Sequence, residues 1–399
     1  MANMNDYLVW RGDIPLAVSP WNEIDALLVS SLSYLDFHGG NDHRGWSLRE
    51  LARIEALIEK EGSATFPARK VAFQRMAESI RFSAARLHHA IALTDEEIAM
   101  QFSAMCLDLE DGTTCVAFRG TDNTIVGWRE DFNMAYQVQV PAQEAAIAYL
   151  NRAAGLSDRP LRLIGHSKGG NLAVYAAASV PESVQRKIES IWTFDGPGMN
   201  QEMAVTEGFL RVKDRIRSFI PQTSIIGLLM EYYRPYTVVR SDVSGISQHD
   251  PMSWQVYGPR FETLEEVDRT AQVVRDTLHD WLDNSSPEQR GAFMDALFYM
   301  VDKTNATHMS DLSGEKLRSL RSMVGGHREV DPETRRVFDR LMTQAIALGF
   351  GNVVDRVRVT YRTHAQLTPE KILKKFSARN GRDSAEKTES PASERQEEA

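Results

Sequence analysis

The residues best suited to chemistry lie in one short run, Gly165-His166-Ser167-Lys168-Gly169-Gly170. A serine set between glycines in the pattern G-x-S-x-G is how many hydrolases present a nucleophile. The pattern has only three fixed positions, however, and a serine in a tight glycine turn can equally well cap a helix. The flanking segments must therefore decide between the two interpretations.

Both flanking segments favour the catalytic interpretation. The apolar residues Leu161 to Ile164 before the run are typical of a buried strand, and the alanine-rich residues Asn171 to Val180 after it are typical of a helix. A strand, a sharp turn and a helix in this order lift a serine hydroxyl out of the edge of a sheet. The helix start also favours negative charge beside the serine. We therefore predict that Ser167 is a nucleophile.

A second segment, Phe118-Arg119-Gly120-Thr121-Asp122, ends a predicted strand upstream. A loop that leaves the sheet at this edge is where a second donor to an oxyanion must come from. We expect the backbone N–H groups of Thr121 and Lys168 to be the two donors, with the Thr121 hydroxyl as an addition. The alternative is an ordinary loop ion pair between Arg119 and Asp122. The Lys168 side chain, if it lay beside this oxyanion hole, would favour an anionic substrate.

These runs resemble two groups of known proteins. Residues 118–121 and 165–170 resemble the class 3 lipases, whose pattern is FRGT followed by GHSLGG, although Lys168 stands where those lipases have leucine. A bacterial lipase-like family, known as a domain of unknown function, is more similar still, through Gly127-Trp128, Phe194-Asp195-Gly196-Pro197-Gly198 and Gln248-His249-Asp250-Pro251 to Trp254. The resemblance runs from about Gln101 to Tyr257 and implies an α/β-hydrolase fold with a lipid or acyl ester as substrate.

A serine nucleophile needs a base, and in this fold the order along the chain is serine, acid, histidine. His249 follows the last predicted strand, Tyr236 to Val239, where such a sheet would place the base. His166 directly precedes the nucleophile, and we expect it to pack or to anchor a loop. The remaining downstream histidines fall in a region of helical pattern: His279, His308, His327 and His364. We therefore predict that His249 is the base.

The acid is harder to assign. The class 3 resemblance would place it after the strand Ile216 to Ile220, but the next residues, 221–226, contain no carboxylate. Asp195 follows the preceding predicted strand, and a triad is defined by geometry rather than by position in the chain. We therefore predict Asp195, although Asp-Gly-Pro-Gly could also be a plain turn. The alternatives are Asp242, Asp250 and Glu231.

The elements that position these residues fall into four predicted parts. We expect a helical lead-in over residues 1–95, an α/β-hydrolase core over 96–260, a helical region over 261–377 and a disordered tail over 378–399. In the core, a hairpin turning at Asp111-Gly112 opens the sheet. Strands then alternate with helices, which indicates a mostly parallel sheet covered on both faces. The expected helices include residues 125–136, 142–154 and 171–180.

Composition limits the partners and the compartment. The 399 residues are 42% hydrophobic and 25% charged, with a formal net charge of -9, which is typical of a globular protein and argues against nucleic acid as a partner. No apolar run is long enough to span a bilayer, and the first ten residues lack the features of a signal peptide, so we expect a cytoplasmic protein. Cys106 and Cys115 are expected to be buried thiols.

The expected chemistry is acyl transfer to water by Ser167, His249 and Asp195, without a cofactor or a metal. The expected partner is a small-molecule or lipid ester, with a transient membrane contact and a protein partner for the helical region as further options. Two alternatives stay open: an acyltransferase or peptidase with the same triad, and an inert binding or regulatory protein on a hydrolase scaffold. The apolar residues 225–230, with Tyr232 and Tyr233, could line an acyl pocket, form a lid or be a core helix.

Overall fold

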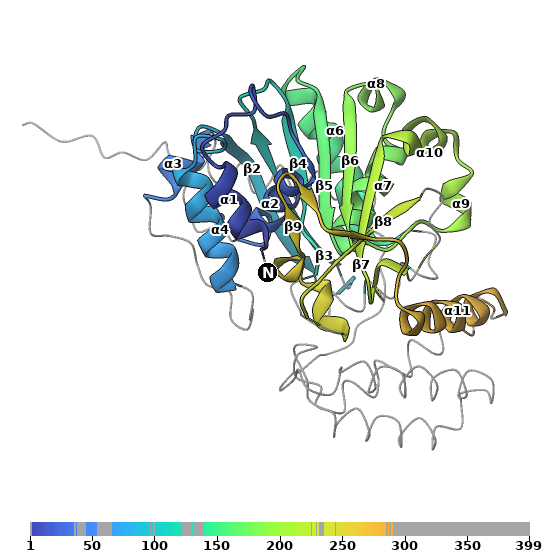
Figure 1. Ribbon diagram of the computed structural model, residues 1–399. Helices are drawn as coiled ribbons and strands as arrows, with labels where there is room; N and C mark the ends of the chain where they lie inside the picture. Colours follow the sequence, from blue (N-terminus) through green and yellow to red (C-terminus); the bar gives the residue numbers. More distant parts are fainter. Residues whose placement is uncertain are drawn as a thin grey trace, which may run out of the picture.

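A computed structural model describes residues 2–284, 286 and 289, apart from residues 36, 38–44, 54–65, 96, 99, 122–129, 131–133, 135–138, 225, 229, 231–234 and 244. Within them, nine strands form one sheet in the order β1-β2-β3-β4-β5-β6-β7-β8-β11 (Figure 1). The strands are β1 (Trp46–Ser47), β2 (Arg86–Asp95), β3 (Met100–Asp108), β4 (Thr114–Phe118), β5 (Leu161–His166), β6 (Ile188–Phe194), β7 (Ile216–Pro221), β8 (Tyr236–Val239) and β11 (Thr263–Leu264). The run from β4 to β8 is parallel, which confirms the predicted α/β-hydrolase fold with its mostly parallel sheet.

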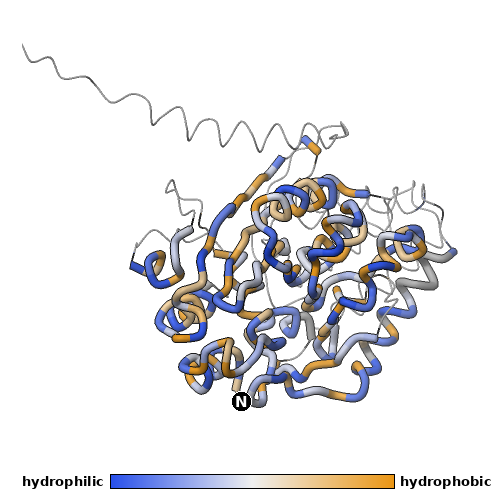
Figure 2. The backbone as a smooth tube through the Cα atoms, turned by 90° about the horizontal axis from the view of Figure 1, so that it is seen from above, coloured by the Kyte–Doolittle hydropathy of each residue, from blue (hydrophilic) through white to orange (hydrophobic). Residues whose placement is uncertain are grey.

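Helices cover both faces of the sheet. They are α1 (Met4–Arg11), α2 (Glu23–Leu32), α3 (Leu48–Leu51), α4 (Phe66–Glu78), α6 (Pro141–Leu156), α7 (Lys168–Ser179), α8 (Glu182–Gln185), α9 (Gln201–Ala204), α10 (Glu207–Val212) and α11 (Arg269–Asn284). Residues of α1, α2 and α4 share one core with Ile164 and Phe194, whereas residues of α6, α7 and α10 share the other with Leu163 and Ile191. Figure 2 shows hydrophobic and hydrophilic residues interleaved along these helices, as expected when one side of a helix packs on a sheet.

The lead-in is less helical than its sequence pattern predicts. Residues 86–95 form β2, which pairs antiparallel with β3, so the hairpin of β3 and β4 does not open the sheet. The alternation expected of a strand is broken because the register shifts between His88 and Ile91 around His89, whose φ is +52°. Because the bulge interrupts the alternation of inward and outward residues, the sequence pattern does not indicate a strand here.

Two further expectations about the sheet need correction. The β3–β4 turn encloses three residues rather than two, because the N–H of Leu109 donates to the carbonyl of Thr113 at 2.9 Å, and the positive φ falls on Gly112 alone. Residues 263–264, in the region expected to be helical, form β11 and pair antiparallel with β8. A small second hairpin precedes them, formed by β9 (Val256–Tyr257) and β10 (Arg260–Phe261).

Other expectations have mixed outcomes. Cys106 and Cys115 are buried free thiols, as predicted, and they face opposite sides of the sheet because Cys106 is opposite Val116 and Cys115 is opposite Leu107. Most of the predicted helix 125–136, of the helical region after residue 284 and all of the tail lie outside the described residues. No helix in the part of the chain that the structure describes is long and apolar enough to cross a membrane.

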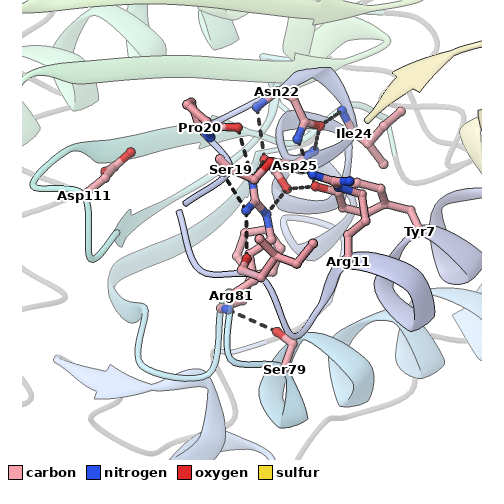
Figure 3. Close-up of polar contacts among 12 residues, drawn as sticks. Tyr7, Arg11, Ser19, Pro20, Asn22, Ile24, Asp25, Ser79, Arg81 and Asp111 are labelled. Carbon is pink, nitrogen blue, oxygen red and sulfur yellow. Dashed lines mark hydrogen bonds and ion pairs between the residues drawn. The ribbon is translucent and has the colours of Figure 1, made fainter. Parts of the chain in front are cut away.

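A buried ion pair fastens the lead-in together (Figure 3). The guanidinium of Arg81 donates from Nε to Oδ1 of Asp25 at 2.7 Å and pairs through Nη2 with the other carboxylate oxygen. Nη1 of Arg81 donates to the carbonyls of Ile14 and Ser19, and the hydroxyl of Tyr7 donates to Asp25 at 2.7 Å. Neither side chain of the pair is exposed. The network thereby fixes α2, which packs on the sheet, to α1 and to the segment after α4.

We predict that Arg81→Met destabilises the protein by about 3–5 kcal/mol, because it leaves the Asp25 carboxylate buried without its counter-charge. The measurement is urea unfolding followed by circular dichroism. Arg186→Met is the control: it removes an exposed pair with Glu182 in α8 and should leave the unfolding midpoint nearly unchanged. Equal shifts for both variants would contradict a special role for the buried pair.

Candidate active site

The predicted nucleophile lies at a sharp turn between strand and helix. Ser167 stands between the end of β5 and the start of α7, with φ +57° and ψ -135°, a conformation that costs a non-glycine residue free energy. Its N–H donates to the carbonyl of Phe194 at 2.9 Å. A Cβ atom on Gly165 would lie 2.1 Å from the backbone of Gly169, so this crossing of strand and helix requires glycine. The turn holds Ser167 at the carboxyl edge of the sheet.

Three predicted residues come together at this edge. The Nε2 atom of His249 lies 3.0 Å from Oγ of Ser167, and its Nδ1 atom lies 2.7 Å from Oδ2 of Asp195. Because a carboxylate only accepts hydrogen bonds, Nδ1 carries the proton and Nε2 is left to accept from the serine hydroxyl. The Asp195 side chain is 1% exposed and that of His249 is 19% exposed. The arrangement can take a proton from Ser167 and hold it on His249.

The position of Asp195 explains the missing carboxylate after β7. Asp195 follows β6 directly, and its Oδ1 atom accepts hydrogen bonds from the hydroxyl of Ser224 and from the N–H of Gly227 at 3.2 Å. The loop after β7 therefore carries hydrogen-bond donors to Asp195 instead of a carboxylate. Of the alternatives, Asp242 is exposed and Asp250 caps the turn at residues 251–253. Glu231 lies outside the described residues.

The loop that carries His249 is held from several sides. His249 ends a 3₁₀ turn, Gly245–His249, whose Gln248 accepts a hydrogen bond on Oε1 from the N–H of Thr223 and on its carbonyl from the indole of Trp254, both at 2.8 Å. The Nε2 atom of His166 lies 2.8 Å from the carbonyl of His249. The prediction that His166 anchors a loop is confirmed, and that loop carries His249.

His166 is also a neutral neighbour of the base. Burial, followed by the nearby charges of His249 and Arg69, holds the pKa of His166 well below its ordinary value. Its Nε2 atom faces a carbonyl and must carry the proton, so Nδ1 accepts from the hydroxyl of Tyr34 at 2.7 Å. The rings of His166 and His249 are 4.6 Å apart. The imidazole that lies against His249 is therefore uncharged.

Two backbone segments border Ser167 where the oxyanion donors are predicted. Lys168 is the first residue of α7, and the N–H groups of a first helical turn point away from the helix. A Cβ atom on Gly120 would lie 2.9 Å from Cβ of Ser167, so the loop after β4 passes directly beside the nucleophile. Thr121 follows Gly120 in that loop. These contacts bring both predicted donor residues next to the turn.

The side chain of Lys168 points away from this site. Its Nζ atom is fully buried and donates to the carbonyl of Gln101 at 3.0 Å and to Oε2 of Glu130 at 2.9 Å. Glu130 also accepts from the N–H groups of Gln101 and Ala142, at 3.0 and 2.8 Å. The expectation that this ammonium favours an anionic substrate is therefore wrong, since the charge is used inside the protein.

Sequence reasoning missed Tyr34, Glu130 and Ser224. Tyr34 contacts His166 from 132 positions away, a separation at which no motif operates. A signal for Glu130 did exist: a lysine in a position normally apolar must be paired if it is buried. No group of three or more His, Cys, Asp or Glu side chains among the described residues could hold a metal ion.

The chain was compared with known proteins. Residues 76–299, more than half of the chain, match the family model described as Mbeg1-like. No curated protein matches. Among solved structures, M37 lipase is 14% identical with a TM-score of 0.32 over 51% of this chain and 67% of that one. A triacylglycerol lipase from Penicillium expansum is 15% identical with a TM-score of 0.31, over 58% and 80%. Rhizomucor miehei lipase in its propeptide complex is 16% identical with a TM-score of 0.29, over 45% and 63%.

We predict that the difference in stability between the natural protein and the His166→Gln variant becomes smaller as the pH falls from 8 to 5. The natural unfolded chain takes up a proton on His166 below about 6.5, whereas the folded chain does not, so stability from this group is present above that pH and lost below it. The variant lacks this loss. Melting temperatures of both proteins across the range would measure it, and a constant difference would contradict a neutral His166.

Lys168→Met should lower stability by about 3–5 kcal/mol, since Glu130 loses its buried counter-charge. The turnover of the folded fraction should change only a few-fold, because the predicted oxyanion donor at this position is the backbone N–H. Urea unfolding and active-site titration together separate the two effects. A stable variant with a large loss of turnover would mean that the ammonium serves the reaction directly.

Proposed function

The chain belongs to the Mbeg1-like family, and we propose that it is a serine hydrolase that cleaves a lipid or acyl ester. One observation carries the proposal: Ser167, His249 and Asp195 form a continuous chain of hydrogen bonds at 3.0 and 2.7 Å. They do so at the carboxyl edge of a parallel sheet, where α/β folds build their sites. Their order along the chain is serine, acid, histidine, as in α/β-hydrolases.

The proposed reaction proceeds in two halves. Oγ of Ser167 attacks the ester carbonyl carbon while its proton passes to Nε2 of His249, and the bond to the alcohol oxygen breaks as that proton is returned to it. Water then attacks the acyl-enzyme with the same histidine as base, releasing the acid and restoring the serine. Asp195 keeps Nδ1 protonated and stabilises the imidazolium in both halves.

Negative charge on the carbonyl oxygen needs donors beside Ser167. We propose the backbone N–H groups of Thr121 and Lys168, which belong to the two segments bordering the nucleophile. A donor of this kind stabilises the transition state by about 3 kcal/mol. Because both are main-chain groups, the side chain at position 168 is free to point inward.

The class of substrate rests on the resemblance of residues 118–121 and 165–170 to the class 3 lipases. The apolar segment 225–230 contributes to the site through a backbone contact with Asp195. Ile226, Leu228 and Met230 are buried, and the turn at 226–228 brings the N–H of Gly227 to Asp195. These described residues are buried and support Asp195 through the turn that they form. Tyr232 and Tyr233 lie outside the described residues.

The test is labelling with a fluorophosphonate probe, together with hydrolysis of short-chain p-nitrophenyl esters. Ser167→Ala should abolish labelling and lower turnover by about 10⁴-fold or more, because the nucleophile is lost. Ser179→Ala is the matched control, since this serine is exposed at the far end of the same helix, and it should change neither readout.

Labelling of Ser167→Ala at the natural rate would assign the nucleophile elsewhere. A folded natural protein that neither labels nor cleaves any ester would favour the inert scaffold instead. Product analysis with added alcohols or amines would distinguish a transferase from a hydrolase.

A further inference from the structure

Arg69 of α4 is a buried arginine whose guanidinium has no hydrogen-bond partner among the described residues. The residue is 9% exposed, and its Nε atom is fully buried and unpaired. Its Cζ atom lies 4.1 Å from the ring centroid of Tyr34, and its Nη2 atom lies 3.9 Å from Oδ1 of Asp250. A separation of 3.9 Å is too long for a hydrogen bond. The guanidinium of Arg69 thus lies over the Tyr34 ring, and its N–H groups donate no hydrogen bond to a described residue.

Arg81 and Arg162, two other buried arginines, have hydrogen-bond partners among the described residues. Arg81 uses Nε and both Nη groups on Asp25 and on backbone carbonyls, as Figure 3 shows. Arg162 donates to Asp111 at 2.7 Å and to Glu189 at 3.1 Å. Burying a guanidinium without hydrogen bonds is costly, so proteins rarely leave one in this state without a use for it. Arg69 differs from these two arginines because its guanidinium donates no hydrogen bond to a described residue.

Its neighbours place Arg69 at the border of the active site. The hydroxyl of Tyr34 contacts His166, the residue before the nucleophile, and would also meet a Cβ atom on Gly120 at 2.4 Å. On the other side, Asp250 directly follows His249. Arg69 therefore lies on the side of the site formed by the base. The leaving group of an ester must lie on that same side, because His249 gives it a proton.

We propose that Arg69 binds an anionic group, a phosphate or a carboxylate, carried by the alcohol portion of the ester substrate. The proposal rests on the serine hydrolase function proposed above and adds the charge of its substrate. A guanidinium donates two parallel hydrogen bonds to either anion, and the aromatic face of Tyr34 keeps its plane fixed. The sequence suggested that Lys168 would supply the positive charge for an anionic substrate. In this proposal Arg69 of the lead-in supplies it, because the Lys168 ammonium is paired with Glu130.

Asp250 is the carboxylate that faces Arg69, and it sets the balance of charge there. At 3.9 Å it offsets the arginine without occupying its hydrogen-bonding positions. A substrate anion would compete with this carboxylate for the guanidinium. Asp250→Asn removes the competing charge and keeps a side chain that can cap the turn at residues 251–253. Arg69 and Asp250 variants should therefore change substrate affinity in opposite directions.

The experiment compares three hexanoyl esters with the full-length protein: the ester of glycerol, of glycerol 3-phosphate and of glycerate. They share an acyl chain and differ only in whether the alcohol is neutral, a phosphate or a carboxylate. We expect the natural protein to prefer one charged ester over the neutral ester by about tenfold or more in kcat/KM. Arg69→Gln should lower kcat/KM for that ester by about 10- to 100-fold, mainly through KM. The neutral ester should change by less than about threefold.

Three further variants sharpen the result. Arg69→Lys should keep part of the preference, because it keeps the charge and loses the fork. Asp250→Asn should lower KM for the charged ester. Lys70→Gln is the matched control, since it removes one exposed positive charge from the same helix and should leave the preference unchanged.

The outcomes separate the two proposals. Equal loss on all three esters in Arg69→Gln, with fluorophosphonate labelling retained, would overturn the anion site and leave Arg69 as a support for the His249 loop. A natural protein that cleaves the neutral ester best would also overturn it, while the hydrolase function would stand. If no ester is cleaved and the probe does not label the folded protein, the hydrolase function fails and the anion site fails with it.

Discussion

The turn at Ser167 is the constraint on which the rest of the site depends. The chain passes from β5 into α7 through one residue with positive φ, and the strand and helix approach so closely that Gly165 cannot carry a side chain. Gly169 cannot carry one either, because its Cβ atom would lie 2.1 Å from the carbonyl oxygen of Phe118 at the end of β4. Such a conformation persists only where its surroundings hold it. Here the hydrogen bond from Ser167 to the end of β6 and the passing loop at Gly120 do so. Because Asp195 directly follows that strand, the bond that supports Ser167 also fixes the position from which the Asp195 side chain starts.

The base reaches this turn by a different route, and the lead-in takes part in it. His166 holds the carbonyl of His249, and Tyr34, just beyond α2, holds His166. The position of α2 depends in turn on the buried pair of Asp25 and Arg81, far from the reacting atoms. Residues of the predicted lead-in therefore take part in positioning His249.

Local features of the sequence were sufficient to predict the parallel sheet and to bring Ser167, His249 and Asp195 into consideration, because each follows a strand and strand ends share an edge. Features that depend on pairing between distant residues could not be predicted in this way. The bulge at His89 concealed β2, and although a buried lysine must be paired, the residues around Lys168 do not identify Glu130 as its partner. The unused guanidinium of Arg69 is visible only when its surroundings are known.

The contact between Tyr34 and His166 has a consequence for how the chain is made. The two residues are 132 positions apart, and α2 precedes β5, one of the strands on which it packs, by a similar length. At about 5–20 residues per second, a ribosome takes roughly 7 to 26 seconds to add that stretch. During this interval α2 lacks β5, one of the strands that it covers in the folded protein. The nascent chain thus passes through a period of exposure to aggregation, in which chaperones that shield apolar helices would have their largest effect.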